Sequence, residues 1–321
     1  MPLLDLPLPK LRRYRGRNPR PRDFDRYWSD ALAELDATPP QPEFIRVDAL
    51  RTPGVECFDL RFTGVGGARL HAKFLRPTRR GRRSPAVLNF HGYGANSADW
   101  STKLPYVHAG MCVAALDCRG QGGSSDDPGG TKGPTLQGHI VRGLDDPDAR
   151  KLFYRAQFLD TAQLARVVMA RPEVDPHRVG AFGLSQGGAL TLACAALEPR
   201  LKLAAPVYPF LSDYQRVWEM DLAKDAYGEL REFFRQFDPR HERERAIFTK
   251  LGYIDVQHLA PRVRARVLMF TALDDNITPP STQFAIYNRL RAPKEMRLYP
   301  DFGHETLPGE ADATFNFLLQ L

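Results

Sequence analysis

The chain has 321 residues, of which 43% are hydrophobic and 10% aromatic, so it can bury a substantial core and is not of the disordered class. Its 45 Lys and Arg residues exceed its 38 Asp and Glu residues, which gives a net charge of +7. The basic residues gather mainly in two short stretches, residues 10–26 and 76–83, without an RNP-type aromatic motif or zinc-finger spacing beside them. We therefore interpret them as solvated terminal and loop charges and expect no nucleic-acid partner.

The cysteines and the N-terminus indicate a reducing compartment. The 4 cysteines form no CxxC pair and have no metal-ligand spacing with a nearby histidine, so the sequence predicts reduced thiols and no metal site. Residues 1–9 contain three prolines and an aspartate, which is unlike a signal peptide. No apolar run approaches the roughly 20 residues needed to cross a bilayer. We expect a cytoplasmic protein without a membrane partner.

Residues 1–40 are predicted to form an N-terminal extension and helix. The first part, up to residue 22, is rich in Pro and Arg and is expected to be extended, whereas residues 24–35 carry large apolar side chains at helical spacing. Residues 57–62 and 69–75 alternate between apolar and polar side chains, which predicts two antiparallel strands with one solvated face. The glycine-rich residues 64–67 are the expected turn between these strands.

From residue 86 onward, short apolar runs alternate with helical patterns. The predicted buried strands cover residues 86–90, 111–117, 179–182, 203–207, 267–271 and 295–299. The predicted helices cover residues 154–170, 187–197, 281–290 and 311–319. This alternation predicts an α/β fold with a doubly wound, mostly parallel sheet that follows the N-terminal antiparallel strands. We expect residues 1–321 to form a single domain.

Residues 209–262 interrupt this alternation. They have a helical pattern and are rich in charged and aromatic side chains, among them Trp218 and Phe233. A segment of this length between two strands of a sheet indicates a helical insertion. The sequence leaves open whether the insertion is a lid over a site or an assembly interface.

A candidate nucleophile lies at Ser185. Residues 183–187 read Gly-Leu-Ser-Gln-Gly and match the pattern G-x-S-x-G. The preceding residues 178–182 have the pattern of a strand and residues 188–196 that of a helix, which is the context required for the nucleophile elbow of an α/β-hydrolase. At this sharp turn small residues are needed on both sides of the serine, and the helix N-terminus favours negative charge near its side chain.

A serine hydroxyl needs a base to become nucleophilic, and in α/β-hydrolases the chain order is Ser, acid, His. Three histidines follow Ser185. His241 lies in a charged run that we interpret as an exposed helix face, and His258 lies near a helix end. His304 lies in the loop between the last predicted strand and the last predicted helix, so we predict that His304 is the base.

The acid is expected in the loop after the strand at residues 267–271. Asp274 and Asp275 both lie there, and their spacing does not decide between them. The pair Pro279-Pro280 fixes the backbone of this loop before the next helix.

Several short motifs occur together in this chain. They are His91-Gly92-Tyr93, Arg119-Gly120-Gln121, Tyr154-Arg155 with Leu159-Asp160, Gly183-Leu184-Ser185-Gln186-Gly187, Thr278-Pro279-Pro280-Ser281-Thr282, Ala285-Ile286-Tyr287-Asn288 and His304-Glu305. With this set the chain resembles, over nearly its whole length, the acetyl xylan esterase and cephalosporin C deacetylase family, carbohydrate esterase family 7.

The resemblance implies a serine esterase without a metal or other cofactor. Its small-molecule substrates would be acetyl esters, namely short acetylated xylo-oligosaccharides and cephalosporin C. It implies that Asp275 is the acid and that the oxyanion hole falls on the backbone N–H of Gln186 and on Tyr93. It also implies a cytoplasmic homo-oligomer, a ring-like hexamer, with residues 209–262 as the insertion used in assembly. Gly94 stands where relatives often carry Asn, which predicts a looser loop, and Leu184 replaces a commoner small residue.

Three further motif residues have structural and functional interpretations. Arg119 and Gln121 follow a strand at the carboxyl edge of the sheet, where ligands bind, so they could shape the floor of the pocket. Arg119 could instead pair with a carboxylate and hold its loop, because Arg forms rigid bidentate pairs, and we favour this interpretation. We interpret Glu305 as a supporting residue rather than a catalyst.

Other functions compete for the same pattern. A peptidase of the prolyl-oligopeptidase type shares the fold and triad order, but the roughly 180 residues before Ser185 leave little room for a substrate-gating domain. A non-catalytic hydrolase-fold binding protein usually lacks a triad residue, and here all are present. A dehalogenase is disfavoured because Ser and not Asp occupies the elbow.

Overall fold

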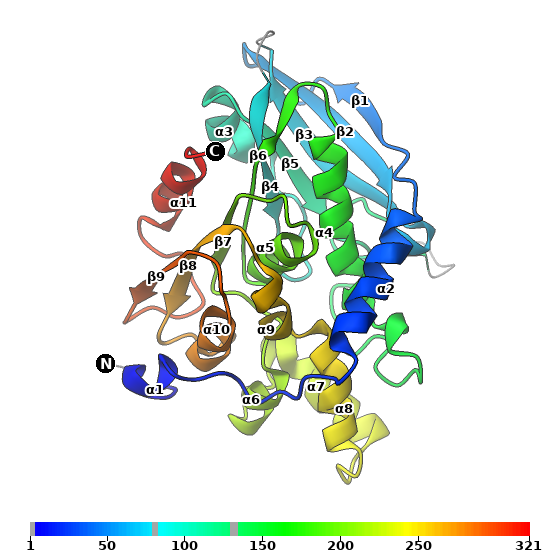
Figure 1. Ribbon diagram of the computed structural model, residues 1–321, viewed down its shortest axis with the longest axis vertical. Coiled ribbons are helices and arrows are strands. Elements are labelled where there is room, and N and C mark those ends of the chain that lie inside the picture. The colour runs from blue at the N-terminus through cyan, green and yellow to red at the C-terminus, as the bar shows by residue number, and fades with distance from the viewer. Residues whose placement is uncertain (1–3, 79–82, 129–133) are drawn as a thin grey trace.

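The computed structural model describes residues 4–78, 83–128 and 134–321. Residues 1–3 of the extension and residues 79–82 of the second basic stretch lie outside the described residues. A nine-stranded sheet forms the centre, in the order β1-β2-β3-β5-β4-β6-β7-β8-β9 (Figure 1). The strands are β1 (Glu43–Val47), β2 (Val55–Thr63), β3 (Arg69–Pro77), β4 (Ser84–Phe90), β5 (Cys112–Asp117), β6 (Val174–Leu184), β7 (Leu203–Val207), β8 (Arg266–Ala272) and β9 (Lys294–Tyr299).

The sheet changes from antiparallel to parallel at β5. Strands β1, β2, β3 and β5 pair antiparallel, and every neighbour pair from β5 to β9 is parallel. This confirms the predicted mostly parallel sheet with N-terminal antiparallel strands. The sequence did not predict β1, because this edge strand has no buried residue and therefore no alternating apolar pattern.

Helices cover both faces of the sheet (Figure 1). On β5, Val113 belongs to the apolar cluster that includes side chains of α3 and α11, whereas the next residue, Ala114, belongs to the cluster that includes α4 and α5. Successive strand residues point to opposite faces, so these clusters are the two sides of one sheet. The helices around the sheet are α2 (Phe24–Asp36), α3 (Leu104–His108), α4 (Phe153–Met169), α5 (Gln186–Leu197), α10 (Pro280–Tyr287) and α11 (Glu310–Leu318).

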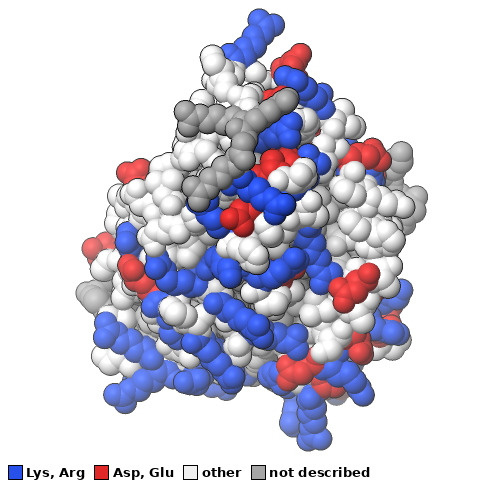
Figure 2. Space-filling view, turned by 45° about the horizontal axis from the view of Figure 1, so that its top comes forward, with Lys and Arg blue, Asp and Glu red and all other residues white. Residues whose placement is uncertain are grey.

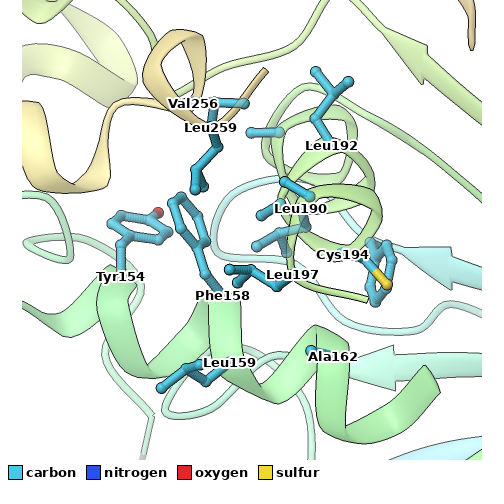
Figure 3. Packing of buried hydrophobic residues seen from close by; sticks show 14 of the residues in the cluster. Tyr154, Phe158, Leu159, Ala162, Leu190, Leu192, Cys194, Leu197, Val256 and Leu259 are labelled. Carbon is cyan, nitrogen blue, oxygen red and sulfur yellow. The ribbon is translucent and has the colours of Figure 1, made fainter. Parts of the chain in front are cut away.

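Helix α5 is the centre of the larger cluster. All twelve of its residues are buried, which explains its continuous apolar sequence. Figure 3 shows Leu190 and Leu197 of α5 beside Phe158 of α4, and Leu259 of the insertion close to the same group. The indole of Trp28 from α2 stacks on Phe158 with ring centroids 6.0 Å apart. The packing therefore holds the helix that begins immediately after Ser185 on several sides.

The insertion predicted at residues 209–262 is helical. Its helices are α6 (Tyr214–Glu219), α7 (Gly228–Phe237), α8 (Glu244–Leu251) and α9 (Val256–Leu259). His241, predicted on an exposed helix face, instead occupies the turn between α7 and α8 with a positive φ of 55°.

The N-terminal arm, residues 4–22, crosses the insertion (Figure 1). Its predicted extended course is interrupted by one short helix, α1 (Leu8–Leu11), which begins after Pro7 and has Pro9 in its first turn, where proline favours helix initiation. Tyr14 donates a hydrogen bond of 2.6 Å to Asp213 Oδ2 of the insertion, and the backbone N–H of Asn18 donates one of 2.7 Å to Asp213 Oδ1. Arm and insertion are thus bound to each other through a buried carboxylate.

The surface is strongly basic on one side. Figure 2 shows that Lys and Arg outnumber Asp and Glu on that face. Several arginines nevertheless have acidic neighbours, for example Arg20, which contacts Asp25 at 2.6 Å. Among the helices of the described residues, none combines the length and the apolar character needed to cross a membrane.

His258, in the helical insertion, makes the stability of the fold depend on pH. It is buried in α9, and its Nε2–H donates a hydrogen bond of 3.2 Å to the carbonyl of Asn18. Burial, with repulsion from Arg289, lowers the pKa of His258 to about 3. The unfolded chain takes up a proton near pH 6.5, but the native state does not, so His258 contributes stability at neutral pH that is lost progressively as the pH falls below about 6.5.

We expect wild type to lose roughly 1–2 kcal/mol more stability between pH 7 and pH 5 than a His258→Gln variant, measured by urea unfolding at both pH values. A His241→Gln variant is the control, because the His241 side chain is 42% exposed, and it should follow the wild type. Equal losses in wild type and His258→Gln would contradict the assignment.

Candidate active site

Ser185 lies on the sharp turn between β6 and α5. Its backbone has φ 56° and ψ −119°, a conformation that a residue other than glycine adopts at a cost of about 1–3 kcal/mol. A Cβ atom at Gly183 would lie 2.5 Å from the carbonyl oxygen of Phe90, and one at Gly187 would lie 2.0 Å from it. Both glycines are therefore required by the close approach of the end of β4, and the turn has the geometry of a nucleophile elbow.

The structure pairs His304 with Asp275. His304 follows β9, and its Nδ1 lies 2.9 Å from Oδ2 of Asp275, which follows β8 and is fully buried. The neighbouring Asp274 is exposed. Of the two candidate acids, only Asp275 contacts the imidazole.

Hydrogen bonds from its own loop fix the Asp275 carboxylate. Oδ2 accepts a hydrogen bond of 2.7 Å from Thr278 Oγ1, and Oδ1 accepts from the backbone N–H groups of Ile277 at 2.9 Å and Thr278 at 2.8 Å. Gln283 Nε2 adds a longer contact of 3.4 Å to Oδ2, and together these donors orient the carboxylate toward His304.

Ser185 and His304 each contact the segment at the end of β7. Among the hydrogen bonds of the described residues, none joins their side chains. The N–H of Ser185 donates to the carbonyl of Val207 at 3.0 Å, and the ring of the next residue, Tyr208, lies 4.4 Å from the His304 ring. Burial, with nearby Glu310 and Asp275, raises the pKa of Tyr208 to about 12, so its hydroxyl stays neutral beside the imidazole. Nucleophile–base contacts are often looser without substrate.

The loop after β4, residues 91–94, faces the elbow. His91 Nδ1–H donates to the carbonyl of Gly92 at 2.7 Å, and His91 Nε2 accepts from the N–H of Cys118 at 3.0 Å. Both contacts require the neutral tautomer with its proton on Nδ1, and burial lowers the pKa of His91 in the same direction. His91 is thus a fixed connector between this loop and the end of β5.

The side chains of Gln186 and Gln121 support the same loop, residues 91–94. Gln186 is buried, and its side chain exchanges hydrogen bonds of 2.9 and 3.0 Å with the side chain of Gln121. Tyr154 donates to Gln186 Oε1 at 2.8 Å, and the N–H of Gly94 donates to Gln121 Oε1 at 3.0 Å. Gln121 therefore supports the loop rather than facing a ligand.

Gly94 itself is more tightly placed than a loose loop would suggest. Its φ is 68°, a left-handed conformation that glycine adopts without penalty, and a Cβ would lie 2.9 Å from the carbonyl oxygen of Leu136. The structure thus anchors Gly94 between Gln121 and the segment around Leu136.

Arg119 and Glu305 contact protein groups. Arg119 Nε and one terminal nitrogen each lie 2.6 Å from an oxygen of Asp160, and both side chains are buried. Glu305 is exposed, and its carboxylate accepts a hydrogen bond of 3.0 Å from the N–H of Gly303 beside His304. Arg119 thus forms a buried bidentate pair with a carboxylate, and Glu305 braces the turn that carries the base.

A pocket of about 670 Å³ lies beside the elbow, between α3 and α11. Leu184, which precedes the nucleophile and is 47% exposed, lines it together with Tyr106, Phe182 and Phe315. Ser185, Asp275 and His304 are not among its lining residues. The apolar wall of this pocket therefore begins at Leu184, next to Ser185.

Three residues that contact the predicted site residues were not predicted from the sequence to have a function. Thr278, Tyr208 and Glu229 touch Asp275, His304 and Tyr93 respectively. Thr278 was visible only as part of a motif. Tyr208 and Glu229 carry no local pattern that marks them, because each meets its partner from a distant part of the chain.

The elbow, the Asp275–His304 pair and the mostly parallel sheet define an α/β-hydrolase. Over residues 1–321 the sequence matches the acetyl xylan esterase (AXE1) family. The chain belongs to this family of esterases.

Known relatives agree with this assignment. Acetyl xylan esterase 1 from Thermoanaerobacterium sp. JW/SL YS485 is 55% identical, with a TM-score of 0.95 over 98% of this chain and 99% of that one. An acetyl xylan esterase from Paenibacillus sp. R4 is 35% identical, with a TM-score of 0.91 over the same shares, 98% and 99%. The acetyl esterase Axe7A of Xylanibacter ruminicola is 26% identical over 291 residues, which are 89% of this chain and 64% of that protein. The chain thus spans a little under two thirds of this curated relative.

The two adjacent aspartates provide a matched test of the acid. Asp275→Asn should lower kcat by about 10⁴-fold, because the amide would favour the wrong imidazole tautomer. Asp274→Asn should leave kcat within about twofold, because surface substitutions rarely disturb a site. Hydrolysis of p-nitrophenyl acetate measures both. A large loss in Asp274→Asn with little loss in Asp275→Asn would reverse the assignment.

The buried Arg119–Asp160 pair should be structurally essential. Asp160→Asn would remove the bidentate carboxylate and leave the buried guanidinium with only the more distant Asp127, at 3.9 Å, so it should destabilise the protein by roughly 3–5 kcal/mol in urea unfolding. Asp36→Asn breaks the contact with Arg166 at a carboxylate that is 66% exposed, and should cost less than about 1 kcal/mol. A small loss for Asp160→Asn would show that Arg119 does not depend on this partner.

Proposed function

We propose that the protein is a serine carboxylesterase that removes acetyl groups from small acetylated carbohydrates, in particular acetylated xylo-oligosaccharides, and from cephalosporin C. The Asp275–His304 contact of 2.9 Å, close to a serine on a strained elbow, is the observation that carries this proposal. The two solved relatives that are 55% and 35% identical are named acetyl xylan esterases, which supports the substrate class.

The proposed reaction passes through an acyl-enzyme. Ser185 Oγ attacks the acetyl carbonyl while His304 accepts its proton, and Asp275 holds the imidazole tautomer and stabilises the cation. His304 then protonates the leaving alkoxide. A water molecule, activated by His304, attacks the acetyl-serine and releases acetate.

The tetrahedral oxyanion would be bound by the backbone N–H of Gln186 and by Tyr93. Gln186 is the first residue of α5, so its N–H is one of the helix-terminal donors without an intrahelical acceptor, and the helix dipole favours negative charge there. Loss of one oxyanion donor typically lowers turnover about 10²–10³-fold.

Compartment and assembly belong to the same proposal. All four cysteines, which lie in the described part of the chain, are free and buried, which supports a reducing compartment such as the cytoplasm. A homo-oligomer, in the form of a ring-like hexamer, is proposed from the family resemblance.

The test is acetate release from p-nitrophenyl acetate, acetylated xylobiose and cephalosporin C by the wild type and by Ser185→Ala. Wild type should turn over all three, and the variant should be about 10⁴–10⁶-fold slower. A p-nitrophenyl butyrate series should react more slowly than the acetate, because a small acyl pocket disfavours longer chains.

Each other outcome overturns part of the proposal. Activity on the activated ester alone would exclude the carbohydrate and cephalosporin substrates. Faster hydrolysis of butyrate would exclude an acetyl-selective pocket. Cleavage of aminoacyl-anilides without ester hydrolysis would favour a peptidase, and a complete lack of activity would favour a non-catalytic binding protein.

A further inference from the structure

The helical insertion reaches into the proposed oxyanion loop through one side chain. Glu229 lies in the first turn of α7, and its Oε1 accepts a hydrogen bond from the hydroxyl of Tyr93. The two residues are 136 positions apart in the chain. This is a direct polar contact between the insertion and the loop at residues 91–94.

Glu229 is itself firmly held. Its second oxygen, Oε2, accepts hydrogen bonds from the backbone N–H groups of Ile140 at 2.9 Å and Val141 at 3.1 Å. Burial raises its pKa, while the hydrogen bonds from Tyr93 and from these N–H groups act in the opposite direction. The carboxylate therefore joins three segments, namely α7, the stretch around residue 140 and the loop after β4.

The Tyr93 side chain is held by several further contacts. Its hydroxyl oxygen accepts a hydrogen bond of 3.2 Å from the N–H of His139 while it donates to Glu229. Its ring meets the rings of His139 and Phe210 edge-on, at centroid distances of 5.4 and 5.7 Å. Burial, with the charge of Glu229, raises the pKa of Tyr93, so the hydroxyl remains a donor.

The loop at residues 91–94 thus has three supports. Gln186 Nε2 donates to the carbonyl of Gly92 at 3.4 Å, and the N–H of Gly94 donates to Gln121 at 3.0 Å, so both neighbours of Tyr93 are fixed through the backbone. At Tyr93 itself the support acts through the side chain, and Glu229 supplies its acceptor. An oxyanion donor must be preorganised, because a displacement of about 1 Å costs on the order of 10²-fold in rate.

We propose that Glu229 is a positioning residue for the esterase reaction: from the insertion, it fixes Tyr93 and thereby the oxyanion loop. The proposal rests on the proposed function of Tyr93 in oxyanion binding. It means that the helical insertion supports the active site through Glu229, in addition to any contribution it makes to assembly.

The test compares Glu229→Gln with Glu232→Gln. Glutamine keeps the size of the side chain and can still accept from the N–H groups of residues 140 and 141. With its single amide oxygen turned to those N–H groups, glutamine presents an amide nitrogen to Tyr93, and this nitrogen is a donor that cannot accept from the Tyr93 hydroxyl. Glu232 lies on the same helix and is 65% exposed, which makes it the matched control.

With p-nitrophenyl acetate, Glu229→Gln should lower kcat about 10–100-fold and change KM less than about twofold, because the lost support matters mainly in the transition state. Glu232→Gln should match wild type. A Tyr93→Phe variant should show a similar kcat loss, and the double variant Tyr93→Phe/Glu229→Gln should be no slower than the slower single variant. Multiplied losses in the double variant would mean that Glu229 does not act through the Tyr93 hydroxyl, and unchanged kcat in Glu229→Gln would overturn the proposal.

Hydrogen exchange of the full-length protein provides a readout independent of activity. In Glu229→Gln the peptide that contains residues 91–97 should exchange faster, and the peptide at the start of α5 should exchange as in wild type. Uniformly faster exchange would indicate general destabilisation, and unchanged exchange at residues 91–97 would contradict a positioning role. If wild type releases no acetate, the proposed function fails, while the exchange data still decide whether Glu229 fixes the loop.

Discussion

The carbonyl oxygen of Phe90 lies so close to residues 183 and 187 that neither position has room for a side chain. This steric constraint determines how the site is built. Because both positions are glycine, the end of β4 can pack against the β6–α5 turn at backbone distance. The turn then forces Ser185 into positive φ, with its side chain lifted from the sheet edge. The same approach brings the next residues of the β4 loop, including Tyr93, over the start of α5. One close contact thus places Ser185, the proposed nucleophile, and both proposed oxyanion donors.

The remaining site residues come from loops whose conformations are fixed by their own hydrogen bonds. Asp275 is oriented by Thr278, three residues later, so the acid is set by local sequence as well as by the fold. His304 depends on Asp275 on one side and on the Tyr208 ring on the other. Tyr93 in the β4 loop depends in turn on the Glu229 carboxylate, which accepts a hydrogen bond from its hydroxyl.

Much of this arrangement follows from local sequence, and the rest does not. Buried strands are continuous apolar runs and the elbow is a pentapeptide, so both could be predicted, as could His304 from its place after the last strand. Asp274 and Asp275 could not be separated by residue spacing, because adjacent loop residues differ in burial only once the chain is folded. Strand β1 has no buried residue, and Asp160 and Glu229 meet partners 41 and 136 residues away. Such contacts depend on packing between elements, which periodicity does not encode.

The site draws on nearly the full length of the chain, and this has a consequence for biosynthesis. During translation the sheet as far as β6 and the elbow emerge before Asp275 and His304, which lie further along the chain. The insertion that carries Glu229 must also dock before the Tyr93 side chain is supported, and the N-terminal arm can be bound by Asp213 only after that insertion has left the ribosome. A nascent chain that ends before His304 therefore exposes the elbow without its proposed base. Synthesis beyond His304, rather than collapse of the earlier part of the sheet, is therefore the step that completes the proposed triad.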